Sequence, residues 1–437
     1  MIQTLPAVLP GALVDTHGID LTPPSSQTSH SPRWRTSVDD VTVAPCGDVY
    51  TLTTALRNTW GVADDEPDPG VANFRYRIIT RHSADGEVLA SALCPSDDDG
   101  SASAVADGDD MTFCVLPDGT LSVNAHRDRT TLIAPDLSRV LATYASTEDR
   151  TAGNGFAGSI SVTPSGRLLC TAAEYGVWGY GSRIANIVGL ADGALTPDNR
   201  PLIEAISSLD PAPARHGDDD LTAQVRYQGS PVGREHRPRP ALTELVAGAD
   251  RLSGWHDSRL GRPVPLADDL FVVPVFAKIY RGGNLGQPFV FALVNDKGEM
   301  TGRLQGLDPR TESPFTGFCF TLAGDPYRGR AFHLNRYGMY AWDRSGALRA
   351  RLDTAAKTFK PLTPFTLAGC APDGDLLLFH RKQHLILRVP APDDLADLPT
   401  VMEDALRTYA KQRTALKKAW APVDWHWVHA SVPVGRL

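Results

Sequence analysis

Leu116-Pro117-Asp118-Gly119-Thr120-Leu121 is one of four copies of the pattern that decides the fold. The other copies are Ala44-Pro45-Cys46-Gly47-Asp48-Val49-Tyr50, Thr163-Pro164-Ser165-Gly166-Arg167-Leu168 and Ala371-Pro372-Asp373-Gly374-Asp375-Leu376. In each copy an apolar stretch enters a Pro-x-Gly turn and a second apolar stretch leaves it. Proline presets φ before the turn, and glycine supplies the positive φ that a tight hairpin requires. The four copies therefore predict a hairpin that is repeated along the chain.

A second polar turn follows the first by about 20 to 40 residues and again precedes an apolar strand. Its copies are Ala84–Leu89, Pro135–Leu141, Asp296–Met300 and Asp343–Leu348, with Asp192–Leu195 as a weaker one. Together the two turns mark a unit of four strands, and Pro117 and Pro164 of successive units are 47 residues apart. Four short antiparallel strands at this period are typical of a β-propeller blade.

We therefore predict an all-β chain whose residues 38–390 form a β-propeller. Blades are expected near residues 38–93, 103–145, 158–206, 268–306, 315–353 and 364–390. This gives six blades, with seven as the alternative. Through the Pro-x-Gly and Asp-x-x-Gly turns, the chain resembles the six-bladed β-propeller proteins of the NHL and TolB-like kind. The resemblance concerns architecture and implies no particular activity.

Three segments depart from the repeat. Residues 1–37 are rich in Pro, Ser and Thr and are expected to be an N-terminal extension, with an outer strand that closes the ring as an alternative. Residues 207–267 form an irregular polar insertion, which would supply either a seventh blade or the missing strand of the fourth. In the C-terminal segment 391–437, Leu398 to Trp420 has the apolar spacing of a helix, with Pro399 and Pro422 at its ends.

Composition and charge set limits on function. Of the 437 residues 42% are hydrophobic and 22% are charged, which is ordinary for a globular protein, and the net charge of −8 argues against nucleic acid or an anionic membrane as partner. No apolar run has the length of a membrane span, and the N-terminus lacks the pattern of a secretory signal. None of the six cysteines forms a C-x-x-C pair, which indicates buried thiols in a reducing compartment. We expect a cytoplasmic protein.

A glycine-rich stretch at residues 279–288 contributes the first candidate site residues. Tyr280, Arg281 and Asn284 would lie in a hairpin loop close to a ligand backbone or an anion. The stretch lacks the helix and the Lys-[Ser/Thr] of a phosphate-binding loop, so a plain hairpin is the competing interpretation.

Two histidine-containing hairpins contribute the next candidates. His333 and Asn335 would share one side of a strand, with Arg336 and Tyr337 toward the turn, and His380, Arg381 and His384 would occupy the comparable place in the neighbouring blade. These groups would bind an anionic or carbohydrate ligand, or else form ordinary solvated turns. A metal would need three or four converging ligands, so we predict neither metal nor cofactor.

The tail holds the densest aromatic cluster, Asp424-Trp425-His426-Trp427-Val428-His429. Trp425 and Trp427 would share one face of a strand. That face would either stack on a sugar or peptide or fix the tail onto the propeller.

The sequence supports three functions in order of preference. The first is a cytoplasmic interaction or scaffold module that presents one propeller face and the 207–267 insertion to a protein partner, because templates for catalysis are missing. The second is a lyase or hydrolase at the channel mouth, which the resemblance allows because six-bladed relatives include such enzymes. Its candidate catalytic residues are His333, His380, Arg336, Arg381 and Tyr280. The third is a sensor that binds a small ligand or sugar.

Overall fold

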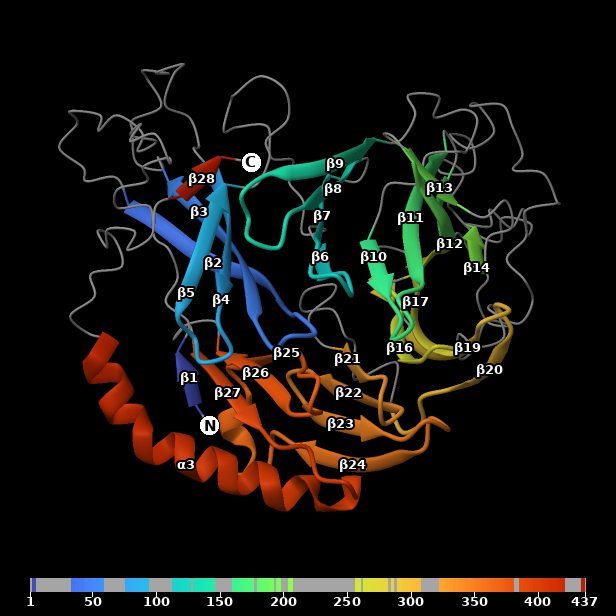
Figure 1. The fold of residues 1–437 in the computed structure, drawn as a ribbon. Coiled ribbons are helices and arrows are strands. Elements are labelled where there is room, and N and C mark those ends of the chain that lie inside the picture. Colours follow the sequence, from blue (N-terminus) through green and yellow to red (C-terminus); the bar gives the residue numbers. More distant parts are fainter. Residues whose placement is uncertain are drawn as a thin grey trace. The chain divides into compact units, whose positions relative to one another are not determined.

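The chain is a β-propeller of small sheets with one C-terminal helix, as the repeat predicts (Figure 1). The computed structural model describes residues 2–4, 33–58, 75–93, 112–126, 129–145, 159–176, 179–191, 194–197, 203–206, 256–260, 262–281, 284–286, 289–307, 322–380, 385–420 and 434–436. These residues form six sheets and divide into two compact units. The first unit comprises residues 1–126, 131–142 and 352–437, and the second comprises residues 127–130 and 143–351.

The first unit is built around three sheets. One contains β2 (Arg33–Val43), β3 (Val49–Asn58), β4 (Arg75–His82) and β5 (Val88–Leu93), with the C-terminal strand β28 (Val434–Arg436) added beside β5. The next contains β6 (Thr112–Val115), β7 (Leu121–His126), β8 (Arg129–Ile133) and β9 (Val140–Ala145). The third contains β25 (Phe365–Cys370), β26 (Leu376–His380) and β27 (Leu385–Val389).

The fourth strand of that third sheet comes from the other end of the chain. β1 (Ile2–Thr4) pairs antiparallel with β27, and Ile2 lies opposite Leu387. The N-terminal strand therefore completes the sheet that the most C-terminal blade begins.

The second unit holds the other three sheets. The first contains β10 (Ser159–Val162), β11 (Leu168–Gly176), β12 (Gly179–Ala191), β13 (Ala194–Pro197) and β14 (Ile203–Ile206). The second contains β15 (His256–Leu260), β16 (Val264–Ala267), β17 (Leu270–Arg281), β18 (Asn284–Gly286), β19 (Phe289–Asn295) and β20 (Met300–Arg303). The third contains β21 (Leu322–Asp325), β22 (Arg330–Leu334), β23 (Gly338–Trp342) and β24 (Leu348–Asp353).

Part of the 207–267 segment belongs to a sheet. β15 and β16 both pair antiparallel with β17. For this segment the sequence allowed either a seventh blade or the missing strand of the fourth blade. The pairing of β15 and β16 with β17 agrees with the second alternative. Residues 207–255 lie outside the described part of the chain.

The four Pro-x-Gly turns have one geometry. Gly47, Gly119, Gly166 and Gly374 have φ of 91°, 87°, 85° and 91°. In each turn the glycine amide donates to the carbonyl three residues earlier, over 2.8 to 2.9 Å. The positive φ that the sequence pattern predicts is therefore present in all four copies.

The second set of turns contains an exception. Leu137 has φ of 59° and is the one non-glycine residue with positive φ among the described residues. This conformation is costly for a side chain with a Cβ. The Leu137 side chain is 3% exposed and packs in a hydrophobic cluster, so its burial offsets the backbone strain.

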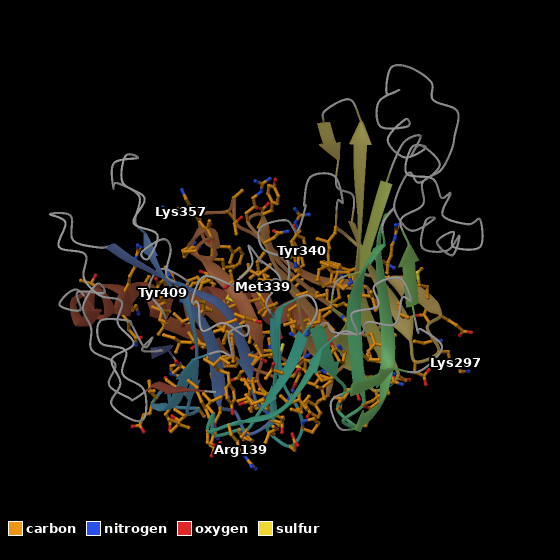
Figure 2. The ribbon with its side chains drawn as sticks, turned by 90° about the horizontal axis from the view of Figure 1, so that it is seen from above. Arg139, Lys297, Met339, Tyr340, Lys357 and Tyr409 are labelled. Atoms are coloured by element: carbon orange, nitrogen blue, oxygen red, sulfur yellow. The ribbon has the colours of Figure 1, made fainter. Side chains whose placement is uncertain are left out.

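The core of the second unit is centred on aromatic side chains of β23. Tyr340 and Trp342 stack with ring centroids 5.8 Å apart, and both are fully buried, as is the neighbouring Met339. The Trp342 indole Nε1 donates to the Gln305 carbonyl over 2.7 Å, which ties β23 to the chain segment that follows β20. Figure 2 shows Tyr340 and Met339 inside the unit, whereas Lys297 projects from it.

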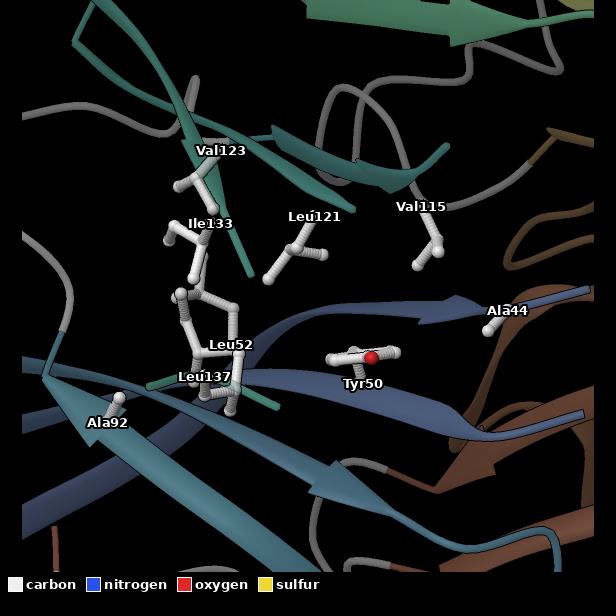
Figure 3. Packing of buried hydrophobic residues seen from close by; sticks show 10 residues of the cluster. Ala44, Tyr50, Leu52, Ala92, Val115, Leu121, Val123, Ile133 and Leu137 are labelled. Atoms are coloured by element: carbon white, nitrogen blue, oxygen red, sulfur yellow. The ribbon is translucent and has the colours of Figure 1, made fainter. Parts of the chain in front are cut away.

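In the first unit, one core cluster joins the β2–β5 sheet to the β6–β9 sheet (Figure 3). Leu52 and Ile79 contribute from one sheet, and Leu121 and Ile133 from the other. The Tyr50 hydroxyl donates to the Pro135 carbonyl over 2.9 Å, so the two sheets are also joined by a polar contact. Burial raises the pKa of Tyr50 to about 12, so this hydroxyl remains a donor well above neutral pH.

The C-terminal helix α3 runs from Leu398 to Trp420, with the bounds that the sequence predicts. A short 3-10 helix, η4 (Leu395–Asp397), leads into it, and the Asp394 side chain accepts a hydrogen bond from the Ala396 amide. Among the described residues, no helix combines the length and the apolar character needed to cross a membrane.

Candidate functional site

His333 lies inside the second unit, on β22. It has no exposed surface, and its ring contacts Phe291 edge-on with centroids 5.1 Å apart. Its Nε2 is 3.3 Å from Nδ2 of Asn335, so the two residues share one side of the chain as alternation predicts. Packing and the polar contact with Asn335 at the start of the turn both help to hold His333.

Arg336 and Tyr337 lie in the turn that follows. The Asn335 side-chain oxygen accepts hydrogen bonds from the amides of Tyr337 and Gly338, over 2.8 and 3.0 Å, and this fixes the turn. Arg336 is exposed, its guanidinium lies 4.5 Å from the centroid of the Tyr337 ring, and it donates to the Tyr337 hydroxyl. The turn thus places a cation and an aromatic ring together at the surface, while His333 stays beneath it.

His380 lies in the first unit, where helix α3 meets the last sheet. Its ring is 5.0 Å from that of Phe365 on β25 and 6.4 Å from that of Tyr409 on α3, and 5% of the residue is exposed. Phe365 and Tyr409 also pack edge to face, with centroids 5.3 Å apart. His380 is therefore part of the surface on which the helix rests.

Helix α3 uses one face to pack on this sheet. Leu398, Met402, Leu406 and Tyr409 recur at helical spacing, and each is at most 4% exposed. Burial raises the pKa of the Tyr409 hydroxyl above its ordinary value. The buried stripe anchors the first three turns of α3.

The helix surface beyond this stripe includes an exposed, charged part. Arg407 pairs with Glu403 and Asp404 at 2.8 Å each, and residues 410–415 are all exposed. After Asp404 the helix has no acidic residue. It carries five cations, which we call the basic half of α3: Arg407, Lys411, Arg413, Lys417 and Lys418.

The apolar spacing of the sequence predicted this helix but not its basic half. The signal was present, because Ala405 to Trp420 contains five cations and no acid in a chain of net charge −8. The sequence alone does not show how α3 packs. In the structure, Lys411 and Arg413 lie on the exposed surface of the helix.

The other predicted site residues are placed only in part. Tyr280 and Arg281 end β17 and pair with Leu285 and Asn284 of β18, so the glycine-rich stretch is a hairpin. Arg381, His384, Trp425 and Trp427 lie outside the described residues. Within the described ranges, no three His, Cys, Asp or Glu residues are grouped so that they would hold a metal ion.

No protein-family model matches the sequence, and no curated protein matches it. Among solved structures, the chain is similar to the hydrazine synthase of Kuenenia stuttgartiensis, with 10% identity, a TM-score of 0.39, and coverage of 84% of this chain and 99% of that chain. It is also similar to BamB from Moraxella catarrhalis, with 8% identity, a TM-score of 0.32, and coverage of 80% and 84%. A third match is the WD40 β-propeller domain of Doa1, with 8% identity, a TM-score of 0.33, and coverage of 82% and 95%. Identities and TM-scores this low transfer no activity, ligand or partner to the chain.

Proposed function

We propose that this chain is a cytoplasmic interaction module, a β-propeller that binds a protein partner and uses the basic half of α3 as part of its contact surface. One propeller face and the 207–267 insertion remain the other proposed contact regions. The observation that supports the proposal is the arrangement of α3. Its apolar stripe is fixed on the last sheet by Met402, Leu406 and Tyr409, while the next turn and a half of helix is exposed.

The charge of that surface favours an acidic partner. The helix dipole favours cations in the last turn of a helix, which accounts for Lys417 and Lys418 without any partner. Lys411 and Arg413 lie more than one turn earlier, and no described acidic residue forms an ion pair with either of them. Complementary charge would guide association and give it a marked dependence on salt.

A charge-reversal experiment tests the proposal. The full-length chain carrying K411E and R413E is compared with wild type as bait in its native host, at low salt, with bound proteins quantified by mass spectrometry. We expect a stoichiometric acidic partner on wild type and about a tenfold loss of it on the variant. Raising the salt concentration should weaken the wild-type complex.

The matched control reverses two cations elsewhere in the same unit. Arg139 and Lys357 are exposed, and both are labelled in Figure 2. The R139E/K357E variant has the same net charge as K411E/R413E and should retain the partner. If both variants lose the partner equally, net charge alone explains the effect. If both retain the partner equally, α3 is not part of the interface. Recovery of nucleic acid in place of a protein would contradict the proposed function itself.

A further inference from the structure

The turn that joins β21 to β22 differs in its side chains from the equivalent turns of the other sheets (Figure 1). In four other sheets the residue after the turn proline is small or acidic, namely Cys46, Asp118, Ser165 and Asp373. Here Pro326 is followed by Tyr327 and Arg328. Tyr327 is 64% exposed, more than any other large hydrophobic side chain in the described ranges. Because hairpins of this kind close with small side chains elsewhere in the chain, folding does not explain the aromatic ring.

The β21–β22 turn is held in a fixed shape from below. The buried Arg330 donates to Oδ2 of the buried Asp325 from Nε over 3.1 Å and from Nη2 over 2.7 Å. The Arg328 amide donates to Oδ1 of Asp325 over 3.2 Å, and Gly329 supplies a positive φ of 63°. Tyr327 and Arg328 are therefore presented on a backbone that is already ordered, which reduces the entropic cost of binding through them.

The turn between β23 and β24 adds a second exposed cation beside the first turn. A Cβ on Gly329 would lie 3.2 Å from the Arg344 Cβ, so the stem of Arg344 rests against the β21–β22 turn. The Arg344 guanidinium pairs with Asp269 at 2.7 Å, but the two side chains are 58% and 62% exposed. Ion pairs this exposed contribute little to stability, so Arg344 can contact a further carboxylate at little cost. We call Tyr327, Arg328 and Arg344 the Tyr327 surface.

The charge of these two turns is opposite to that of their counterparts. In the corresponding turns of the β2–β5, β6–β9 and β15–β20 sheets, the cations are Arg139 and Lys297, and the acids are Asp48, Asp85, Glu87, Asp118, Asp136, Asp268, Asp269, Asp296 and Glu299. The two turns of the β21–β24 sheet instead carry Arg328 and Arg344 with one acid, Asp343. In a chain of net charge −8, this pair of turns favours the approach of an acidic segment, whereas its counterparts oppose it.

We infer that the Tyr327 surface is the docking site for an acidic segment of the protein partner. An apolar side chain of that segment packs on the Tyr327 ring, and carboxylates on either side of it pair with Arg328 and Arg344. Tyrosine and arginine are the residue types that, with tryptophan, carry most of the binding energy in protein interfaces. The inference rests on the proposed function, because it names the part of the propeller that meets the partner, and it goes beyond the contact through α3.

A synthetic peptide tests the surface without the partner. The probe is fluorescently labelled Gly-Asp-Glu-Pro-Leu-Glu-Asp-Gly, and its uncharged counterpart is Gly-Asn-Gln-Pro-Leu-Gln-Asn-Gly. Anisotropy on the full-length chain at low salt should show saturable binding of the acidic peptide and at least about tenfold weaker binding of the uncharged one. Y327A should weaken the acidic peptide about fivefold, and Y327F should leave its affinity unchanged, because the ring is retained. Equal affinity of wild type and Y327A would overturn the inference.

Three double charge reversals that change the net charge equally locate the peptide. R328E/R344E alters the Tyr327 surface, K411E/R413E alters the basic half of α3, and R139E/K357E alters neither. We expect R328E/R344E to weaken the acidic peptide about tenfold and to exceed the effect of each other variant at least about fivefold. A smaller margin would place the peptide on α3 or reduce its binding to net charge, and would overturn the inference. If R328E/R344E fails to fold, the comparison of Y327A with Y327F decides alone.

A crosslinking experiment separates this inference from the proposed function. A photoreactive side chain at residue 327 should crosslink to the purified partner from the α3 experiment, whereas one at residue 118, the equivalent turn tip of the β6–β9 sheet, should not. A partner that binds through α3 and never crosslinks at residue 327 would overturn the inference and leave the proposed function standing. If wild type retains no partner, the proposed function fails, and the peptide measurements decide on the Tyr327 surface. A wild-type dimer that Y327A abolishes would assign the surface to a second copy and overturn the inference.

Discussion

His82 is a titratable group enclosed in the first unit at the end of β4. It has no exposed surface, and its Nε2 lies 3.2 Å from the Thr51 hydroxyl on β3. Burial lowers the pKa of His82 to about 4, although the nearby Gly86 carbonyl acts in the opposite direction. The folded chain therefore holds this imidazole neutral at a pH where an unfolded chain would protonate it.

This difference predicts a loss of stability in mild acid. At pH 7.5 the histidine is neutral in both states. At pH 5 it is protonated only in the unfolded state, where its pKa is about 6.5, which stabilises that state by roughly 2 kcal/mol. The loss should begin as the pH falls through about 6.5 and be complete below about 4. Urea unfolding of wild type and His82→Gln at pH 7.5 and 5.0 checks this, and equal acid losses in the two proteins would contradict it.

Single residues also show what the sequence could not supply. Alternation along β22 correctly put His333 and Asn335 on one side, because strand periodicity is local. That His333 is enclosed by Phe291 of β19 depends on a contact between two sheets, which no local pattern encodes.

Among the turns, Gly47 and Gly346 have nearly the same φ, 91° and 80°, in different surroundings. A Cβ on Gly47 would meet the Ala84 Cβ at 3.7 Å, whereas one on Gly346 would lie 2.5 Å from the Arg303 carbonyl oxygen. We expect Gly47→Ala to cost about 1 kcal/mol through backbone strain alone, and Gly346→Ala at least about 2 kcal/mol more because backbone must move. Denaturant midpoints of both variants test this, and equal losses would contradict it.

Helix α3 was the element that could be predicted most closely. Its apolar spacing and the proline at its second position gave the bounds Leu398 and Trp420 that the structure shows. Its role in covering His380 could not be predicted, because Phe365, His380 and Tyr409 come together from three separate elements.

At the scale of the whole molecule, turn patterns repeated along the chain were enough to predict the propeller. They did not place β15 and β16, because residues 256–267 include Pro263 and Pro265 and lack a recognisable turn pair. One Trp-Asp dipeptide of the kind found in propeller blades is present at Trp342-Asp343, and Trp342 is fully buried at the end of β23.

The pairing of β1 with β27 predicts that three N-terminal residues matter for stability. Gln3→Pro removes an amide from a strand of only three residues and should lower the unfolding midpoint by a few degrees, about 1–2 kcal/mol, while exposing the edge of β27 to aggregation. Gln3→Thr keeps the amide and should behave as wild type. Thermal unfolding with light scattering distinguishes them, and identical midpoints for both variants would contradict a structural role for β1.

The same pairing has a consequence for biosynthesis. β1 leaves the ribosome about 380 residues before β27, a wait of roughly 20 to 80 seconds at ordinary rates of translation. β5 waits nearly as long for β28. A nascent or prematurely terminated chain therefore exposes two open sheet edges, which would allow a chaperone or protease to distinguish it from the finished polypeptide.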